Sequence, residues 1–387
     1  MAIPFEYNLR NLTVRRTATL MTAGGIGLVV AILVLTLALA NGFQQTLVAT
    51  GSPDNVLVIR TGAQTEMMSG LRREVAHILA TDQNVATNPG GEALATFESV
   101  VLTNLERAGG GTSNITVRGV GPHCLALRPD VRLIEGRMFL PGMEEIIVGA
   151  ALSQRFKGCQ LGSSLRFGAR DWKVVGIFGA GGNGFESEIW GDAETMMPAF
   201  DRGAYSSVTM RMIDPHAFES MERRLENDPR LRVDVFREGD YYANQSAQLV
   251  QVIRVLGFFL VIVMAVGAVF GALNTMYAAV GARTREIGTM LALGFTPWNV
   301  LASFLVESIL LSLAGGIIGC LLALPINGIS TGTTNWASFS EVAFRFQVTP
   351  GILAIGLVAS IFLGAIGGFF PARNAARRKV ADALRAG

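Results

Sequence analysis

Four long apolar segments constrain the fold of this chain more than any other feature of its sequence. They cover residues 19–40, 249–282, 299–324 and 351–370, and about twenty apolar residues in helical form are enough to cross a bilayer. Because hydrocarbon offers no water to backbone amides, each segment is predicted to be a transmembrane helix. Only 16% of the 387 residues are charged, whereas soluble domains carry about a quarter. The sequence therefore predicts an α-helical membrane protein with four transmembrane helices.

The basic residues beside these segments predict the orientation, because short basic flanks favour the cytoplasm. The loop 325–350 contains a single basic residue, Arg345, which Glu341 balances. The other flanks carry Arg10, Arg15, Arg16, Arg283, Arg285, Arg373, Arg377, Arg378, Lys379 and Arg385. The segments expected in the cytoplasm are therefore 1–18, 283–298 and 371–387. The insert 41–248 and the loop 325–350 are expected outside.

A secretory signal is an alternative interpretation of the first apolar segment. Arg15 and Arg16, the apolar run and Ala38-Leu39-Ala40 together resemble a signal peptide with its cleavage site. The apolar region of such a signal usually has about seven to fifteen residues, whereas this run covers 19–40. An uncleaved helix is the favoured interpretation, and N-terminal sequencing would distinguish the two.

The insert 41–248 between the first two helices is predicted to be an α/β extracytoplasmic domain. Short alternating runs rich in β-branched residues predict strands at 55–60, 114–119, 172–178 and 206–212. Helical patterns occupy 71–79 and 216–225, and the Asp-Pro pair at 214–215 is typical of a helix start. Two subdomains are expected, with the division near 121–130.

The sequence carries no recognisable catalytic or nucleotide-binding motif. A phosphate-binding loop needs a lysine followed by serine or threonine, but glycine or valine follows Lys157, Lys173 and Lys379. None of the three histidines has a second ligand at metal-binding spacing. The glycine run at 179–184 lacks the acidic residue of a dinucleotide site. We therefore predict a non-enzymatic membrane subunit with no metal or cofactor of its own. The net charge of +2 is too small to indicate a nucleic-acid partner.

Two of the three cysteines could either form a disulfide or remain free thiols. Cys124 and Cys159 both lie in the insert, while Cys320 lies in an apolar segment. A disulfide between the first two is one interpretation, although their spacing does not support it. Small buried thiols are the favoured interpretation.

The cytoplasmic connection has the pattern of a short amphipathic helix. Residues 281–296 read GARTREIGTMLALGFT. Charged residues come first, and apolar residues follow at helical spacing until Gly294 stops the helix. Such a helix would lie along the membrane surface, where an interfacial anchor without a partner is an equally weighted alternative.

At this connection the sequence resembles a known family. ArgThrArgGluIleGly at 283–288, followed by AlaLeuGly at 292–294, resembles the coupling segment of MacB/FtsX-like (type VII) ABC transporter permeases, which include the LolC and LolE permeases. The run FLVESILLSLAGGIIG at 304–319 resembles their third span. Further similar stretches are YNLRNL at 7–12, PARNAARRKVADALR at 371–385 and, resembling their periplasmic core domain, RLIEGRMF, EEIIVGAALSQRF and WKVVGIF. Two departures concern the ATPase contact: Met290-Leu291 and Lys379-Val380 stand where relatives usually have basic residues and an Asp-Pro pair.

The resemblance implies a permease subunit without a fused ATPase. A dimer of such chains in the bacterial inner membrane would sit on a dimer of ABC ATPase subunits, which bind ATP and Mg. A homodimer is the favoured form, and a dimer of two paired chains is the alternative. The coupling helix would receive motion from the ATPase, and the first two spans would pass it to the periplasmic domain, a mode called mechanotransmission. The resemblance assigns the ATPase contact to Arg283, Arg285, Glu286, Ile287, Leu291 and Gly294.

Small and ionisable residues inside the spans indicate where helices meet. Pairs of glycines four residues apart allow close helix approach, within one chain or in a dimer, and they are Gly267 with Gly271, Gly315 with Gly319, and Gly364 with Gly368. Glu307 lies inside the third span, where a carboxylate usually faces a partner. A polar link that shifts during the working cycle, a static hydrogen bond and a snorkelling carboxylate are its three interpretations.

The function predicted from these features is export or extraction of an amphipathic substrate, because the spans carry too few charges for a polar solute pathway. An FtsX-like signalling module, which activates a periplasmic partner without transport, is the alternative. A periplasmic adaptor and an outer-membrane channel are further expected partners that the sequence leaves open.

Overall fold

The computed structural model describes residues 16–378, and the chain folds as two compact units. The helical unit comprises the described residues up to Asn41, then 252–329, and the chain from Phe346 onward. The α/β unit comprises 42–251 and 330–345. Part of the sequence predictions, namely the stretch 7–12, Arg10, Arg15, Lys379, Val380 and Arg385, lies outside the described residues.

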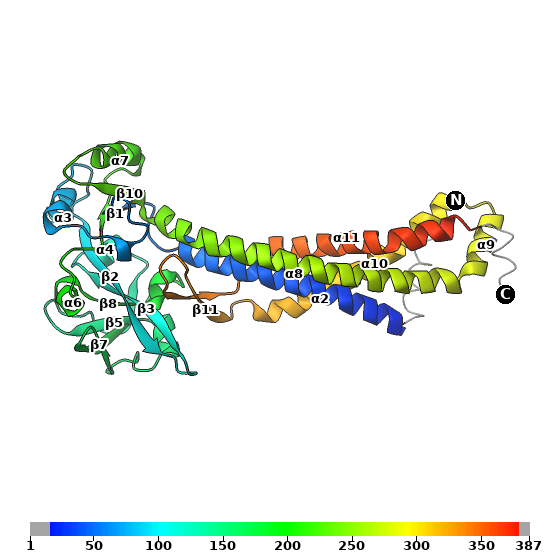
Figure 1. The fold of residues 1–387 in the computed structure, drawn as a ribbon, viewed down its shortest axis with the longest axis horizontal. Helices are drawn as coiled ribbons and strands as arrows, with labels where there is room; N and C mark the ends of the chain where they lie inside the picture. The colour runs from blue at the N-terminus through cyan, green and yellow to red at the C-terminus, as the bar shows by residue number, and fades with distance from the viewer. Residues whose placement is uncertain (1–15, 379–387) are drawn as a thin grey trace. The chain divides into compact units, whose positions relative to one another are not determined.

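Four helices are long and apolar enough to cross a membrane: α2 (Arg16–Val48), α8 (Glu238–Ala282), α10 (Pro297–Ala323) and α11 (Pro350–Ala376) (Figure 1). The short helix α9 (Thr284–Ala292) follows α8, and the 3-10 turn η4 (Leu324–Ile326) follows α10. Threonine caps followed by proline begin α10 and α11, since the side chains of Thr296 and Thr349 accept hydrogen bonds from backbone amides.

Three of these helices extend beyond their predicted limits. Helix α2 continues past residue 40 to Val48 because Phe43 and Leu47 are buried in the α/β unit. Helix α8 begins at Glu238 rather than at 249, and Glu238 and Asp240 in its first turn favour a helix N-terminus. Helix α11 continues to Ala376 rather than ending at 370. Hydrophobicity marks the apolar part of a helix and not its polar ends.

The α/β unit is built on one ten-stranded mixed sheet, in the order β10-β1-β9-β2-β3-β8-β5-β7-β4 with β6 paired to β7. The strands are β1 (Asn55–Arg60), β2 (Ala95–Glu106), β3 (Thr112–Val120), β4 (Arg132–Gly136), β5 (Glu145–Gly149), β6 (Ser164–Phe167), β7 (Arg170–Gly179), β8 (Glu188–Asp192), β9 (Ser207–Arg211) and β10 (Val233–Arg237). The β3–β8 and β5–β7 pairs are parallel. All four predicted strands are present. The sheet does not divide at 121–130, because β3 pairs with β8 and so joins both halves of the insert.

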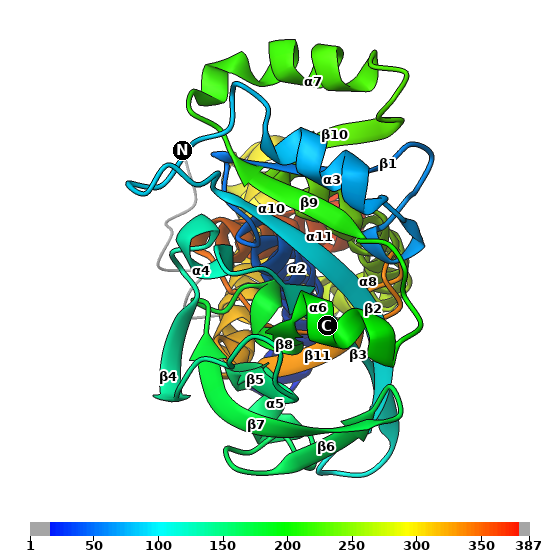
Figure 2. The ribbon, with the colours of Figure 1, turned by 90° about the vertical axis from the view of Figure 1, so that its left-hand side faces the viewer.

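Short helices cover the sheet. They are η1 (Glu66–Met68), α3 (Arg73–Ala80), α4 (Cys124–Leu127), α5 (Ala150–Arg155), η2 (Gly184–Ser187), α6 (Ala193–Ala199), η3 (Pro215–Ala217) and α7 (Phe218–Glu226). Figure 2 shows α3 and α7 at the β10–β1–β9 end of the sheet. There Val75 and Leu79 of α3 and Met221 of α7 share a hydrophobic core with Val56 and Val58 of β1.

Both cysteines of the insert are free and buried in separate hydrophobic cores. Cys124 packs with Trp190 and Phe185, whereas Cys159 packs with Trp172 and Phe167. Burial raises the pKa of each thiol to about 12. The structure therefore agrees with the favoured interpretation of buried thiols.

A hairpin between α10 and α11 belongs to the α/β unit, although both helices belong to the helical unit. Its strands β11 (Ser330–Thr334) and β12 (Glu341–Arg345) pair antiparallel in a two-stranded sheet of their own. The sequence analysis predicted a simple loop over 325–350. The composition of this short polar segment gives no sign of its partner.

Candidate coupling site and the buried charge network

Helix α9 is amphipathic, and its inner face is anchored within the helical unit. Thr284, Ile287 and Gly288 are buried. Ile287 is fully buried in a cluster with Val300 and Phe304 of α10 and Ala372 of α11. The helix is therefore part of the helical unit and does not lie apart from it as a loosely attached segment.

An ion pair fixes the start of α9 to α10. Arg283 Nη1 donates to Glu307 Oε2 at 2.7 Å, and both side chains are almost completely buried. The guanidinium group also lies 6.0 Å from the ring centroid of Phe304. A buried carboxylate needs such a partner, because unpaired burial of charge is costly. The ion pair excludes the snorkelling interpretation of Glu307.

Two of the residues that the resemblance assigns to the ATPase contact have buried side chains. Arg283 is 7% exposed and Ile287 is 0% exposed, so neither side chain is available on the outer face of α9. Their positions support the helix from within. Arg285 and Glu286 are exposed, while Leu291 is partly buried against the inner cluster. Gly294 follows the helix with a positive φ of 95°, which allows the chain to turn there.

Two exposed apolar residues beside these charges were not predicted from the sequence. Leu293, just after α9, is 74% exposed, and Trp298, in the first turn of α10, is 75% exposed. Together with Arg285 and Glu286 they form what we call the α9 outer face. Leu293 is exposed because α9 ends at Ala292, before the apolar pattern ends.

Two of the three predicted glycine pairs lie at helix contacts. A Cβ on Gly315 would lie 2.6 Å from the carbonyl oxygen of Ala23 in α2, and Gly319 approaches the same helix. A Cβ on Gly364 would lie 2.7 Å from Cβ of Ser312 in α10, and Gly368 meets Ser308 on that helix. The hydroxyl of Ser308 also donates to the carbonyl of Gly364 at 2.8 Å. Close approach requires glycine at these positions.

The third pair, Gly267 and Gly271 on α8, meets no other atoms within 4 Å in the described part of this chain. This pair therefore marks no helix contact among residues 16–378. Another glycine of α8, Gly257, instead contacts Thr36 of α2. The four candidate spans also differ in how much of each is buried within the chain, and the span in α8 is the least buried.

A buried charge network lies in the α/β unit, and the sequence analysis did not predict it. At its centre Arg118 of β3 is 1% exposed. Its guanidinium group lies 2.8 Å from Glu66, 2.7 Å from Glu98 and 2.7 Å from Glu188. An arginine has five N–H donors, and carboxylate oxygens on all sides can accept hydrogen bonds from all of them. The partners come from η1, β2 and β8, so one side chain connects three parts of the unit.

A second buried arginine extends the network to the start of α8. Arg128 Nη1 lies 2.7 Å from Glu98 Oε1, although this pair lacks the alignment of a hydrogen bond. Arg128 also lies 2.9 Å from Glu238, which accepts a hydrogen bond from Asn55 at 2.8 Å. In total, four buried carboxylates face two buried guanidinium groups. No sequence signal identifies the network, because each ion pair joins residues far apart in the chain.

The surroundings determine how these carboxyl groups titrate. Burial alone would raise the pKa of Glu66, but the charge and hydrogen bonds of Arg118 outweigh it and hold the pKa below its usual value. Burial raises the pKa of Glu98, even though Arg128 and Arg118 oppose the shift. Burial also raises the pKa of Tyr242, whose hydroxyl donates to Glu66 at 3.2 Å. The network therefore contains carboxyl groups with opposite shifts.

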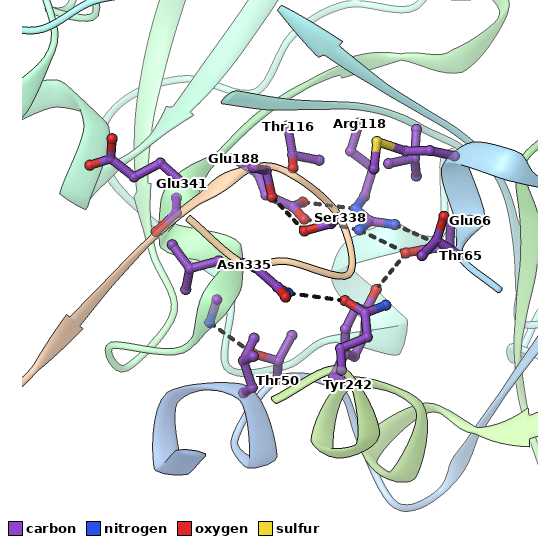
Figure 3. Close-up of a pocket in the computed structure, with 18 of the residues that line it drawn as sticks. Thr50, Thr65, Glu66, Thr116, Arg118, Glu188, Tyr242, Asn335, Ser338 and Glu341 are labelled. Carbon is purple, nitrogen blue, oxygen red and sulfur yellow. Dashed lines mark hydrogen bonds and ion pairs between the residues drawn. The ribbon is translucent and has the colours of Figure 1, made fainter. Parts of the chain in front are cut away.

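A small cavity of about 50 Å³ borders the network (Figure 3). Figure 3 shows Arg118 between Glu66 and Glu188, and Asn335 and Ser338 of the β11–β12 hairpin also line the cavity. Thr50 near the end of α2 and Tyr242 of α8 also line it. Parts of three elements that continue into the helical unit therefore meet at one cavity within the α/β unit.

These features define a membrane protein with four apolar helices and a large mixed α/β domain. The family model of the MacB-like periplasmic core domain matches residues 19–228, more than half of the chain, and that of the FtsX-like permease C-terminal region matches 258–380. The chain therefore belongs to the MacB/FtsX-like family of ABC transporter permeases. Family and helices together indicate a multi-pass protein of the bacterial inner membrane.

Curated relatives include larger proteins whose names describe an ATP-binding part. The chain is 24% identical over 407 residues to the macrolide export ATP-binding/permease protein MacB of Hahella chejuensis, covering 96% of this chain and 58% of the relative. It is 26% identical over 404 residues to the pyoverdine export ATP-binding/permease protein PvdT of Pseudomonas entomophila, covering 97% of this chain and 58% of the relative. The chain thus spans less than two thirds of these relatives.

Among solved structures, the periplasmic region of MacB from Actinobacillus actinomycetemcomitans aligns with a TM-score of 0.38 at 12% identity. The alignment covers 52% of this chain and 94% of that one. A similarity this low supports no conclusion beyond those already reached from the family models.

Proposed function

We propose that this chain is the permease subunit of an ATP-driven exporter. It couples ATP hydrolysis by a separate ABC ATPase subunit to movement of the α/β unit. Through this movement it exports or extracts an amphipathic substrate. In this arrangement both termini and α9 lie in the cytoplasm, and the α/β unit lies in the periplasm. The basic flanks of the spans support that orientation.

The α9 outer face is the observation that carries the proposal. It combines two charged side chains, Arg285 and Glu286, with the exposed Leu293 and Trp298. Tryptophan and arginine are the residues that most often dominate protein interfaces. A soluble ATPase offers this face a partner, and the face needs one because large exposed apolar side chains beside charges are typical of docking surfaces.

The inner contacts of α9 supply a route for force. Because Arg283 and Glu307 are paired inside the protein, a displacement of α9 also displaces α10. Ile287 adds packing against Val300 of α10 and Ala375 of α11. A rigidly anchored helix transmits displacement, whereas a surface helix held only by lipid would tilt without moving its neighbours.

Association of two copies is part of the proposal, and α8 is the helix that would mediate it. Gly267 and Gly271 leave an open small-residue surface on α8, flanked by the exposed side chains of Val263 and Phe270. Such surfaces allow close packing of helices from two chains. Membrane lipid would also cover this surface in an isolated chain, so the prediction concerns the assembled protein.

The substrate class rests on the composition of the spans. The buried intramembrane charge of Glu307 is neutralised by Arg283, which leaves no charged path for a polar solute along α10. The relatives named above carry the names of macrolide and pyoverdine exporters. We propose an amphipathic substrate collected on the outer side, with ATP and Mg bound only by the partner ATPase.

Copurification with a candidate ATPase tests the proposal. The wild-type chain is expected to retain the ATPase and alter its turnover. Trp298→Ala and Arg285→Glu are expected to weaken binding about thirtyfold, the effect of removing an interface residue worth about 2 kcal/mol. Arg223→Ala is the matched control, because Arg223 is an exposed arginine of α7 in the α/β unit.

Two results would contradict the proposal. If no candidate ATPase bound the wild-type chain, the coupling function would be wrong. If Trp298→Ala bound as well as wild type, the α9–α10 turn would be only an aromatic anchor at the lipid interface. Binding of the ATPase without transport, together with capture of a periplasmic hydrolase by the full chain, would favour the signalling alternative over export.

A further inference from the structure

The β11–β12 hairpin is fixed in the α/β unit by an acidic residue with two arginine partners. Glu341 is 1% exposed, at the first position of β12. One of its carboxylate oxygens is ion-paired with Arg107, which follows β2, and the other with Arg155 at the end of α5. A carboxylate held by a guanidinium group at each oxygen is strongly localised.

Neighbouring contacts attach the rest of the hairpin to the same unit. The backbone amide of Ala343 donates to Ser187 Oγ of η2 at 2.8 Å. Phe344 is buried with its ring 5.5 Å from that of Phe43 in an edge-to-face arrangement. At the tip, Asn335 donates to Gln245 of α8 at 3.3 Å. Strand β12 is therefore part of the core of the α/β unit.

The base of the hairpin is held equally firmly, but inside the helical unit. Gly328 N donates to the carbonyl of Phe346 at 2.8 Å, and Phe346 N donates to that of Ile329 at 3.1 Å. Gln347 N donates to the carbonyl of Ala38 in α2 at 3.3 Å. These bonds fix the two ends of the hairpin connection within the helical unit.

A segment fixed at both ends transmits displacement. The hairpin has a hydrogen-bonded ladder along its length, from Ser330 opposite Arg345 to Thr334 opposite Glu341. At the start of β12, Glu341 connects the hairpin to the β2–β3 region through Arg107 and to α5 through Arg155. We infer that the hairpin is a second coupling route, by which movement of α10 and α11 drives the α/β unit, and that Glu341 is the positioning residue that secures it.

This inference rests on the proposed function and adds to it a route through the connection between α10 and α11. A chain driven only through α2 and α8 would have no need for a buried, doubly paired carboxylate in the connection between α10 and α11. A simple turn would connect those helices with fewer residues. The doubly paired glutamate makes this attachment sensitive to one substitution, because loss of the Glu341 charge deprives Arg107 and Arg155 of their common partner.

The first measurement uses the full chain in lipid nanodiscs without any ATPase. Amide hydrogen exchange of residues 330–345 is expected to be slow in the wild type and about tenfold faster in Glu341→Gln. Residues 95–120 should stay protected. Glu144→Gln is the matched control, since Glu144 is a half-exposed carboxylate of the same unit that pairs with Arg170. Equal protection of 330–345 in Glu341→Gln and wild type would overturn the inference.

The second measurement uses the complex with the ATPase. Addition of ATP is expected to change the exchange of residues 95–120 in the wild type. In Glu341→Gln at least half of that change should be lost, while ATP turnover stays within about twofold, because the α9 outer face is untouched. A purely structural defect would lower both readouts together.

The outcomes of the second measurement separate this inference from the proposed function. A full ATP-dependent response in Glu341→Gln would overturn the second route alone. No response in the wild type would overturn the proposed function and, with it, this inference.

Discussion

The two units of this protein differ in the contacts that most closely join their helices and strands. In the helical unit, helices meet through glycine, alanine and serine, as where Gly315 faces Ala23 of α2 and Gly364 faces Ser312 of α10. In the α/β unit, large side chains such as Trp172, Trp190 and Phe178 are fully buried, and a six-residue charge network crosses the strands.

This difference teaches how each unit can move. Small residues bring helix backbones close together, so those contacts depend on backbone approach. Interlocked aromatic groups and buried ion pairs resist displacement, because any shift leaves gaps or unpaired charges. We therefore call the α/β unit the rigid unit, and under the proposed function it would move as a body.

The largest expected effect comes from breaking the rigid unit at its centre. Arg118→Met leaves Glu66, Glu98 and Glu188 buried without their common partner. A destabilisation of about 3–5 kcal/mol is expected, as for other buried pairs that lose one member. Urea-dependent proteolysis of the full chain measures it, with Arg223→Ala as the exposed control. A variant as stable as wild type would refute the view that the network holds this unit together.

A smaller effect is expected where the helical unit is overpacked. Gly315→Leu places a side chain against the Ala23 carbonyl, whereas Gly267→Leu enters open space. Gly315→Leu should lower the free energy of unfolding by about 1–3 kcal/mol, as measured by thermal unfolding in detergent. Gly267→Leu should leave the single chain unaffected and reduce dimer formation, which cross-linking measures. Equal destabilisation by both would show that the α8 surface is also an internal contact.

The pH dependence of the rigid unit sharpens the comparison further. The lowered pKa of Glu66 contributes stability that is lost as the pH falls through its folded pKa. The raised pKa of Glu98 acts oppositely, because its charged form costs stability and protonation on acidification relieves that cost. Removing the second effect leaves the first unopposed.

Glu98→Gln is therefore expected to lose more stability than wild type between neutral pH and about pH 4, near the unfolded carboxyl pKa. Chemical unfolding of the full chain at several pH values measures the slope. The exposed-carboxylate variant Glu144→Gln should follow the wild type. A slope for Glu98→Gln equal to or shallower than that of wild type would contradict the assignment of opposite shifts.

The smallest effect concerns the cysteines of the rigid unit. Cys124 and Cys159 are buried, and burial raises the pKa of each to about 12, so few thiolates exist at about pH 8. Alkylation by iodoacetamide is expected to fail in the folded protein and to proceed in urea, as read by mass spectrometry. Rapid labelling of the folded chain would show that the core around one cysteine opens.

The sequence by itself determined the parts that depend on local patterns. Apolar length identified the four spans, and alternation identified β1 and β9. Motif order identified the family. Glycine spacing located two close helix contacts within the chain, because helices that approach closely need small residues where they meet. The helical spacing around Ile287 indicated that α9 is amphipathic, although not which of its residues face inward.

Only the tertiary structure decided the contacts between distant residues. The pairing of Arg283 with Glu307, the network around Arg118 and the pinning of Glu341 each require side chains from separate elements to meet. The fold also turned Leu293 and Trp298 outward at the turn after α9. Charged residues carry no mark of future burial in a single sequence, because the same side chain is stable in water until the fold supplies its partners.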